Sequence, residues 1–393
     1  MKVKYLITSV LSTFLISQTV YAGSLYGHFG IGERQYAVSA RSLGMGGVNL
    51  ALFDEFTLSR WNPAQWSNIS PVRINLRSLT SYNSVTDGAS STFTDFNGFS
   101  MGIPIGSKFT AGGSIFPISS SEYALSQSGS TNGEPWNLTV SGNGGISSFS
   151  LGIAYQINER FSVGIKNDWL FGMKEEEWLT KFDNIDLLSS KFLVSNSFRG
   201  TLLTVGFFSN LNKFNYAGSL TIPKKLTMIR KISYTTIDAK ISPADEIDYP
   251  TELRLGFTYD LGERYNFGLD YQRGDWGSFK SDFNGKFGIA YDIFGGIERK
   301  ISVSEENLFK RLAFRGGFTL RRLYTSGLDE SSISEKAVTV GIGIPAHDGK
   351  EIFDIGFSYG LRGSEENIAV EETTFLIMIG ISAGEKWFIR RRR

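Results

Sequence analysis

The residue types that usually carry out chemistry in proteins are scarce in this chain. It contains no Cys and only two His, His28 and His347. Without Cys there is no disulfide framework, cysteine metal site or cysteine nucleophile, and two isolated His leave little for acid–base catalysis. The sequence has no phosphate-binding loop, zinc signature or nucleophile elbow. We therefore predict that the protein is not an enzyme, has no catalytic residue or metal site, and uses no cofactor.

Two short acidic runs are the remaining clusters of ionisable side chains with a chemical interpretation. Glu175 to Glu177 and Glu371 to Glu372 fall in predicted outer loops. Their carboxylates could bind divalent cations that bridge lipopolysaccharide, but such runs are more typical of solvated loops. The formal net charge is only +1, so the chain has no bulk attraction for nucleic acid, and we expect no nucleic acid partner.

The elements that must position any site are β-strands, as the hairpin at residues 251–272 illustrates. Apolar side chains alternate with polar ones, so that Leu253 and Leu255 share one face while Arg254 and Gly256 share the other. A period of two is typical of a strand with one dry and one wet face, and a soluble β-sandwich would show it too. Here the dry face is aromatic and uncharged, and the wet face carries ions and glycines. That difference favours a strand with lipid outside and a hydrated or plugged lumen inside.

The same unit recurs about fourteen times along the chain. The predicted strands are 71–82, 96–106, 108–118, 146–157, 160–172, 198–209, 213–222, 251–261, 264–276, 285–299, 309–322, 336–345, 350–362 and 373–383. Each is near or above the length that a tilted strand needs to cross a bilayer. The fold prediction is all-β: a transmembrane antiparallel β-barrel of about fourteen strands at residues 71–383.

The connections between the predicted strands alternate in length. Long ones are expected at 119–145, 173–197 and 223–250, and most of the others are short turns. Short turns at one end and long loops at the other are expected for an outer-membrane barrel with both chain ends in the periplasm. Trp169 and Trp276 fall toward the long-loop end, where we expect one of the two aromatic girdles.

The two ends of the chain carry targeting and tail segments. Residues 1–22 have the parts of a signal peptide, with Lys2 and Lys4 before an apolar run and a small-residue exit at Ala22. A membrane anchor is the alternative, disfavoured because the apolar core is short. We expect export to the outer membrane, with outer-membrane lipid around the barrel. Residues 384–393 form a basic tail that we expect in the periplasm near lipid head groups.

The segment at residues 23–70 lacks the alternation and is rich in small residues. Gly44, Gly46 and Gly47 would let the backbone pack closely or adopt positive φ. The segment is either a small periplasmic lead-in or an N-terminal hatch, a plug inside the lumen. Many glycines fall on the predicted inner face of the barrel, which favours the plug because glycine in a strand often marks the close approach of another segment. The alternative is that these glycines only ease curvature.

Two motifs in this segment carry a resemblance to known families. Met45, Gly46 and Gly47 are followed about fifteen residues later by Asn62, Pro63 and Ala64. This pair resembles the hatch of the FadL/TodX outer-membrane family, which includes long-chain fatty acid and aromatic hydrocarbon transporters. It also resembles the start of PorV/PorQ-type barrels of the type IX secretion system. The resemblance implies that these six residues form the hatch or gate. Gln65 and Trp66 depart from the Gly-Leu that usually follows, so the finer assignment stays open.

The same resemblance suggests a side exit from the barrel. In the fatty-acid transporter family a kink in the third strand opens a lateral path into the membrane. The third predicted strand contains Gly112, Gly113 and Pro117, and proline is confined to strand edges or bulges. We expect the lateral opening at Gly112 and Gly113, with ordinary bending of the barrel as the alternative.

Ligand contacts are expected at the aromatic residues of the long loops and on the last strand. Trp136, Trp178, Phe182 and Leu187 are the loop candidates for collecting a hydrophobic small molecule. The last strand is apolar on both faces, so its inward Leu376 and Met378 would touch either the plug or a hydrophobic ligand.

These features predict passive uptake of hydrophobic small molecules, of the long-chain fatty acid or hydrocarbon type, across the outer membrane. The alternative is a PorV/PorQ-like barrel of the type IX secretion system whose outer loops bind secreted proteins. A nonspecific porin is disfavoured because the inner glycines suggest an occupied lumen.

Overall fold

The computed structural model describes residues 23–85, 90–131, 133–183, 188–234, 240–279, 286–302, 305, 307–326, 332–346, 350–363 and 371–385. The predicted signal peptide at residues 1–22, the candidate ligand residue Leu187 and the end of the basic tail at residues 386–393 lie outside the described residues.

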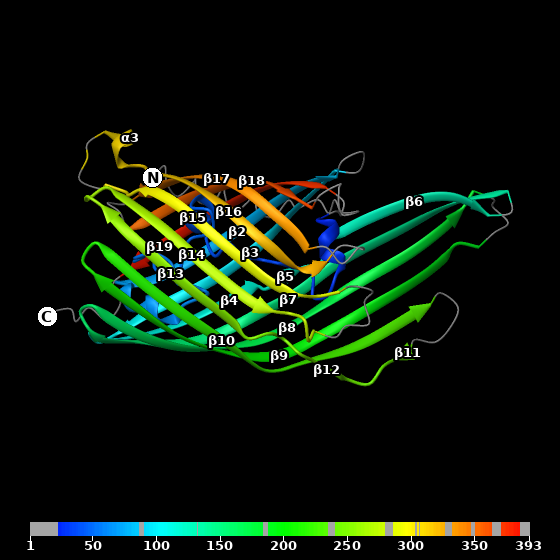
Figure 1. Cartoon of the computed structure of the whole chain (residues 1–393), viewed down its shortest axis with the longest axis horizontal. Coiled ribbons are helices and arrows are strands. Elements are labelled where there is room, and N and C mark those ends of the chain that lie inside the picture. Colours follow the sequence, from blue (N-terminus) through cyan, green and yellow to red (C-terminus); the bar gives the residue numbers. More distant parts are fainter. Residues whose placement is uncertain are drawn as a thin grey trace, which may run out of the picture.

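Fourteen strands form a closed antiparallel barrel, as predicted (Figure 1). They are β2 (Val72–Val85), β3 (Ser90–Ile105), β4 (Phe109–Pro117), β7 (Glu134–Asn158), β8 (Phe161–Phe182), β9 (Ser190–Leu211), β10 (Phe214–Tyr234), β13 (Glu252–Leu261), β14 (Tyr265–Asp275), β15 (Ile289–Arg299), β16 (Ala313–Ser326), β17 (Ser332–Ala346), β18 (Glu351–Arg362) and β19 (Glu372–Glu385). The last strand closes the ring on the first, because β19 pairs with β2 along its whole length.

Short strands and helices supplement the barrel. The strands are β1 (Glu33–Arg34), β5 (Ser119–Ser120), β6 (Tyr123–Thr131), β11 (Lys240–Ile241) and β12 (Asp245–Ile247). The helices are the 3-10 helices η1 (Leu25–His28) and η2 (Pro63–Asn68) and the α-helices α2 (Ala40–Gly44) and α3 (Leu308–Arg311). Within the part of the chain that the structure describes, no helix has the length and hydropathy needed to cross a membrane.

The side chains divide between the two faces of the wall as the alternation predicts. On β13, Leu255 is 47% exposed on the outside, whereas Arg254 is 1% exposed on the inside. The register pairs outward residues with outward residues and inward residues with inward ones. Leu255 lies opposite Tyr271 of β14, and Arg254 lies opposite Gln272. An apolar outer face and a polar inner face are what a bilayer requires of a barrel. The protein is an outer-membrane β-barrel.

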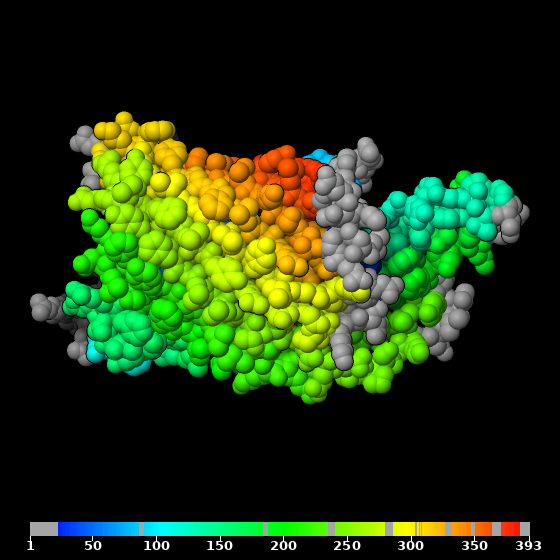
Figure 2. All heavy atoms as spheres, in the orientation of Figure 1, coloured from blue at the N-terminus to red at the C-terminus, as the bar shows by residue number. Residues whose placement is uncertain are grey.

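Four neighbouring strands, β7 to β10, are far longer than the sequence analysis predicts. They have 25, 22, 22 and 21 residues, whereas β13 has 10. Their outer portions, together with β6, project beyond the barrel at the long-loop end (Figures 1 and 2). We call this the outer extension: β6 with residues 134–145, 173–182, 190–197 and 223–234. The predicted loops at 119–145, 173–197 and 223–250 were wrong over these residues, because strands beyond the bilayer need no apolar face and lose their alternation while the ladder continues.

Residues 23–70, here called the lumen segment, contact the inner face of the barrel. The segment has little regular structure, and most of its residues from Ala37 to Trp66 are buried. α2 contacts β16, β17, β18 and β19, and η2 contacts β4, β7, β8 and β9. The two helices therefore touch opposite parts of the wall, and the chain between them crosses the lumen (Figure 1).

Candidate functional site in the barrel lumen

The turn that contains the first motif lies directly on the backbone of the wall. Gly46 and Gly47 have φ of +71° and +105°, a conformation that favours glycine. The Gly46 amide donates to the hydroxyl of Thr339 at 2.9 Å, and the Thr319 hydroxyl donates to the Gly46 carbonyl at 2.7 Å. Met45 is fully buried beside them. The turn is thus bonded to β16 and β17.

The second motif lies against β8 and β9. Asn62 caps η2, because its side-chain oxygen accepts from the Ala64 amide at 3.1 Å. Its side-chain nitrogen donates to the Phe207 carbonyl at 2.9 Å, and the Ser162 hydroxyl donates to the Ala64 carbonyl at 3.0 Å. Pro63 opens the helix, where its missing N–H costs nothing. Both motifs therefore attach the segment to the wall; whether they act as a gate stays a prediction.

Inward glycines of the wall provide the space that the lumen segment occupies. A Cβ at Gly341 would lie 2.9 Å from the Gly44 Cα, and a Cβ at Gly256 would lie 2.6 Å from the Leu50 Cβ. The same crowding against residues 40–69 occurs at Gly102, Gly112, Gly164, Gly206, Gly268, Gly296, Gly317 and Gly356. The expected link between inward glycines and a close-packed segment is confirmed at these positions. Gly288, which has nothing within 4 Å of its ideal Cβ, is an exception.

The last strand also packs against the lumen segment. Met378 is buried in one cluster with Ala40 and Leu43, and Leu376 packs against the same cluster. Leu376 and Met378 therefore touch the lumen segment, one of the two occupants that the sequence allowed, and their contact with a ligand stays a prediction. The apolar inner face of β19 thus covers α2.

A chain of buried ion pairs crosses the inner face from β19 to β13. Glu335 lies 2.9 Å from Arg362 and 3.0 Å from Arg321. Arg321 also lies 3.0 Å from Asp292, and Arg362 lies 3.2 Å from Glu372. We call the whole set the ion-pair belt; its members are Glu33, Arg34, Glu252, Arg254, Asp292, Arg321, Glu335, Arg362 and Glu372.

The lumen segment supplies two members of the ion-pair belt, Glu33 and Arg34. Arg34 lies 2.9 Å from Glu252 and 3.8 Å from Asp292, and Glu33 lies 2.6 Å from Arg362. A buried charge that loses its partner is strongly destabilising. The belt therefore ties the segment to this side of the wall. The sequence analysis placed Arg254 on the inner face but did not identify the ion pairs of the belt.

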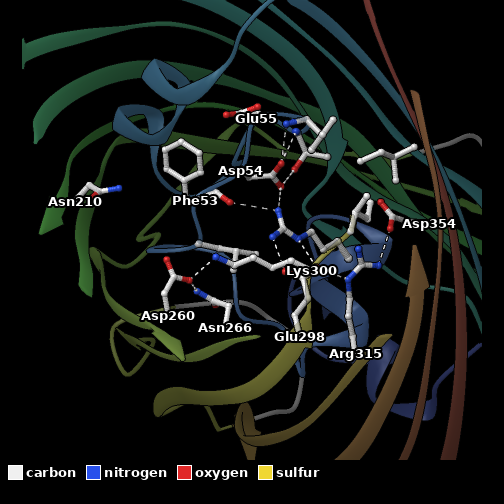
Figure 3. A pocket seen from close by; sticks show the side chains of 16 residues that line it. Phe53, Asp54, Glu55, Asn210, Asp260, Asn266, Glu298, Lys300, Arg315 and Asp354 are labelled. Carbon is white, nitrogen blue, oxygen red and sulfur yellow. Dashed lines mark hydrogen bonds and ion pairs between the residues drawn. The ribbon is translucent and has the colours of Figure 1, made fainter. Parts of the chain in front are cut away.

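A second group of charges lines a cavity of about 510 Å³ at the short-turn end (Figure 3). Arg41 lies 2.6 Å from Glu298 and 3.1 Å from Asp54. Arg315 lies 2.7 Å from Glu298 and 2.6 Å from Asp354. Burial alone would lower the pKa of Arg41, but the carboxylates of Glu298 and Asp54 outweigh burial and raise that pKa. Both arginines of this cavity therefore have carboxylate partners.

The third strand of the wall is continuous at the predicted opening. β4 pairs without interruption with β3 from Phe109 to Ile115 and with β7 from Phe109 to Pro117. This uninterrupted ladder counts against the predicted lateral opening at Gly112 and Gly113. A Cβ at Gly112 would lie 2.6 Å from Leu58. This glycine makes room for the lumen segment.

Instead, β3 and β4 stop pairing just beyond Ile115, and the wall separates between these two strands. Among the described residues, the part of β3 before Phe99 pairs with β2 alone. A register shift lies opposite Arg77, where Gly98 has φ of +130°. The chain after Pro117 forms β5, which pairs with β1 of the lumen segment. We call this separation the wall opening: residues 90–98 on one side and residues 116–123 on the other.

A cavity of about 220 Å³ lies in the wall opening. Its lining includes Leu79 and Gln35 from the inside and Met173, which is exposed on the outside of the barrel. Pro117 also lines it, so this residue of the predicted exit does border an opening, although Gly112 and Gly113 do not. Asp95 and Glu122 face the same cavity, and burial raises the pKa of Glu122.

An apolar cluster fills the long-loop half of the lumen. Trp276 is fully buried in it, so its predicted place in an aromatic girdle was wrong. The indole stacks on Tyr324 with ring centroids 4.5 Å apart. We call this the apolar lumen cluster; it comprises Ile31, Ile118, Ile146, Leu170, Phe198, Leu202, Leu226, Met228, Ile247, Tyr249, Trp276, Phe279, Ala290 and Tyr324. Ile118 and Ile146 are chain neighbours of Pro117, Ser119, Gly145 and Ser147, which line the cavity, but no member of the cluster lines the cavity itself.

The predicted aromatic ligand contacts lie on the outer extension, away from this cluster. Trp136 of β7 lies opposite Phe182 of β8. Trp178 stacks on Phe192 with ring centroids 5.5 Å apart. None of these residues belongs to the apolar lumen cluster. Their contact with a ligand stays a prediction. No group of three or more potential metal-ligating side chains occurs among the residues that the structure describes.

Comparison with known proteins supports the fold. A family model described as BamG matches residues 1–393. The structure is similar to the CymD monoaromatic hydrocarbon channel, with a TM-score of 0.61, 16% identity, and coverage of 89% of this chain and 98% of that chain. It is similar to a Pseudomonas aeruginosa FadL homologue (TM-score 0.60, 10% identity, 89% and 98% coverage). The Ralstonia pickettii toluene transporter TbuX is comparable (TM-score 0.59, 15% identity, 89% and 98% coverage).

At these identities the likeness establishes the fold, and the predicted resemblance to FadL/TodX barrels is confirmed at that level. None of the three is described as an enzyme, in keeping with the prediction from sequence. Among curated proteins, none matches this sequence.

Proposed function

This chain belongs to the BamG family, and we propose that it forms an outer-membrane channel through which hydrophobic small molecules enter by diffusion. The observation that carries the proposal is the wall opening beside the apolar lumen cluster. The cavity in that opening reaches from Leu79 inside the lumen to Met173, which is exposed on the outside of the barrel where the outer extension begins. A hydrophobic solute that reaches the cluster would gain a lateral path into the membrane without crossing the polar short-turn end.

The lumen segment would act as the hatch in this scheme. It fills the lumen through the glycine contacts and the ion-pair belt. A direct aqueous path through the bore would therefore require the segment to move, whereas the wall opening needs only local adjustment of β5 and β6. The proteins named above, a monoaromatic hydrocarbon channel and a toluene transporter, have the same fold and support a solute of this kind.

A cross-link across the wall opening tests the proposal. The native chain has no Cys, so Asn97→Cys and Ser120→Cys would create the only thiols, one on each side of the cavity. In proteoliposomes, joining the pair with a bis-maleimide is expected to abolish uptake of a radiolabelled long-chain hydrocarbon or fatty acid. The matched control joins Ser100→Cys and Ser114→Cys, which lie opposite each other where the wall is already continuous. Uptake that survives the first cross-link would refute the lateral route.

A second candidate function is supported by the outer extension. Trp178, Phe192 and Tyr234 form a continuous aromatic stack on it. Aromatic side chains are enriched at protein interfaces. As a PorV/PorQ-like barrel of the type IX secretion system, the protein would use this stack to bind exported proteins. Co-purification of secreted proteins that is lost on Trp178→Ala, with hydrocarbon uptake unchanged, would favour this function over the first.

A further inference from the structure

A hollow of about 460 Å³ lies on the outer face of the barrel wall, at the foot of the outer extension. It spans three neighbouring strands, β8, β9 and β10. Two cations line it, Arg199 of β9 and Lys225 of β10, together with two exposed aromatic side chains of β8, Trp169 and Phe171. None of these four residues lines the two cavities described above or belongs to the apolar lumen cluster. The hollow is thus a separate feature of the surface that faces the membrane.

The strand register places these four residues side by side. Thr201 of β9 lies opposite Trp169 on one side and opposite Lys225 on the other. Arg199 lies opposite Phe171 in the next outward row of side chains. Arg199 and Lys225 are therefore diagonal neighbours across β9 and β10, about 7–8 Å apart. Two long cationic side chains at that spacing can both reach one phosphate group.

An irregularity in β10 brings the lysine to the outer face. The register of β10 against β9 shifts between Pro223 and Lys225, so that Lys224 is an extra residue in the ladder. Plain alternation from the outward Ile222 would point Lys225 into the lumen. With the extra residue, Lys224 and Lys225 are both exposed. A β-bulge re-aims a side chain in this way, and here it adds positive charge to the hollow.

Arg199 marks the outer limit of the lipid-facing band. Between it and the short turn of β9, the outward residues include Leu203, Val205 and Phe207, none of which is charged. A lysine or arginine is costly at the bilayer midplane but is tolerated near the interfaces. Trp169, one row closer to the midplane, is of a residue type that is enriched at those interfaces. The two cations therefore lie at the level of the lipid head groups of the outer leaflet.

The protein itself leaves positive charge in the hollow available to a ligand. Among the described residues, no carboxylate pairs with Arg199. Lys225 pairs with Glu246 of β12, but the two side chains are 59% and 69% exposed. Such exposed pairs contribute little, whereas phosphate is a strong partner for both kinds of cation, so a phosphate can replace Glu246. Glu175 lies two outward rows beyond Arg199 and accepts a hydrogen bond from Ser195 at 2.9 Å.

We propose that Arg199 and Lys225 bind a phosphate of the lipid A part of lipopolysaccharide, and that Trp169 and Phe171 contact the acyl chains of the same lipid. Cations at the head-group level beside exposed aromatic side chains match a phosphorylated glycolipid of the outer leaflet. An acidic protein segment would match the cations but not the aromatic side chains at lipid depth. The site goes beyond the proposed function, because this lipid lies outside the wall and fixes the depth of the barrel in the membrane.

Binding of two matched lipids tests the assignment. The full chain in an uncharged detergent is mixed with bis-phosphorylated lipid A or with the same lipid A after removal of its phosphates, and native mass spectrometry measures the bound lipid. The native protein is expected to bind the phosphorylated form about 10-fold or more tightly, because each cation near a lipid surface favours an anionic head group. The double variant Arg199→Gln with Lys225→Gln is expected to lose that preference.

A matched control removes the same charges from the other end of the same strands. Arg160→Gln with Lys213→Gln changes one exposed arginine and one exposed lysine in the short turns that flank β8, β9 and β10. This control is expected to keep the preference for the phosphorylated lipid. Hydrocarbon uptake is expected to be unchanged in both double variants, so that failure of this proposal leaves the proposed function intact.

Three results would overturn the proposal. Equal binding of the two forms of lipid A by the native protein would show that the hollow does not recognise phosphate. A preference that survives in the variant lacking Arg199 and Lys225 would place the phosphate elsewhere on the protein. Equally tight binding of phosphatidylglycerol would show that any anionic lipid is accepted and would refute the assignment to a glycolipid.

A conservative variant and a stability measurement guard against a merely structural role. Arg199→Lys keeps the charge but loses the planar fork of the guanidinium, so it is expected to retain most of the preference. The thermal midpoint of each variant, followed by the heat-dependent mobility of the barrel on gels, is expected to match that of the native protein, because the substituted side chains are exposed. A lowered midpoint together with an unchanged lipid preference would assign Arg199 and Lys225 to the stability of the strands and overturn the proposal.

Discussion

The two sides of the barrel lumen differ in whether their buried arginines have carboxylate partners. On the side formed by β13 to β19, each buried arginine of the inner face has a carboxylate partner: Arg254, Arg315, Arg321 and Arg362. The lumen segment contributes Glu33 and Arg34 to the ion-pair belt on this side. On the side formed by β2 to β4, Arg60 and Arg77 are buried with donors that no described residue satisfies. The wall is continuous on the first side and separates on the second.

This difference indicates which side of the lumen anchors the lumen segment and which side is open to a ligand. Buried charges that satisfy one another hold elements in one arrangement, and removal of one partner is strongly destabilising. Buried charges without partners are more typical of a binding site. We therefore regard the β13–β19 side as the anchor of the lumen segment and the β2–β4 side as the ligand route.

The largest expected effect comes from breaking the ion-pair belt at its centre. Glu335→Gln removes the carboxylate that Arg321 and Arg362 share. We expect a loss of about 3–5 kcal/mol in the free energy of unfolding, because two buried guanidinium groups lose their common partner. Urea unfolding in lipid vesicles measures it. The control is Glu177→Gln, which disrupts the more exposed pair with Lys191 and should cost at most about 1 kcal/mol. Equal losses in the two variants would contradict the anchoring role.

The next effect tests whether the anchored side holds the lumen segment by close packing. A Cβ at Gly317 would lie 2.5 Å from the Met45 carbonyl carbon, with backbone on every side. Gly317→Ala is therefore expected to destabilise the packed state by about 1–3 kcal/mol and to loosen the segment. Faster trypsin cleavage at Arg34 or Arg41 in intact vesicles would report the loosening. Gly288→Ala, where the added Cβ meets nothing within 4 Å, is the matched control. Unchanged cleavage in Gly317→Ala would refute the packing.

A smaller effect is expected where the segment meets β9. Asn62→Ala removes the cap of η2 and the hydrogen bond to the Phe207 carbonyl. Loss of such a cap typically costs about 1 kcal/mol. The thermal midpoint of the barrel should fall slightly, and ion conductance in planar bilayers should rise if the motif gates the lumen. A stable variant with native conductance would leave Asn62 as a structural cap only.

The smallest effect tests the position of the opening. Gly113 lies in the continuous ladder, and its ideal Cβ is 3.0 Å from a terminal methyl of Leu151, which can move. Gly113→Ala should therefore leave hydrocarbon uptake within about twofold of the native rate, since small surface changes usually shift energies by only tenths of a kcal/mol. Loss of uptake in this variant would place the lateral exit at Gly112 and Gly113, as the sequence predicted, and would contradict an exit through the wall opening.

The sequence alone was sufficient for the barrel, because lipid imposes a period of two on every strand that crosses it. All fourteen strands occur where the alternation predicts them. The prediction failed for residues beyond the bilayer, where lipid no longer imposes a period of two. The outer extension has no lipid-facing side, and Trp276 turns inward just beyond the end of β14.

The site was less accessible to sequence reasoning than the fold. The sequence analysis did not single out Arg321 and could not say that Asp292 and Glu335 would be its carboxylate partners, because pairing depends on register across several strands. For the same reason it could not reveal that Arg77 has none. Arg60, which directly precedes Trp61 and the Asn62-Pro63-Ala64 motif, was likewise not singled out.

The most direct test of the account is to locate a bound amphiphile. A crystal structure of the full chain with a fatty acid brominated at its terminal carbon would place both ends of the ligand, the bromine by anomalous scattering. The account predicts the bromine in the wall opening or beside the apolar lumen cluster. A carboxylate bound instead to Arg41 and Arg315 at the short-turn end, or a ligand only on the outer extension, would contradict it.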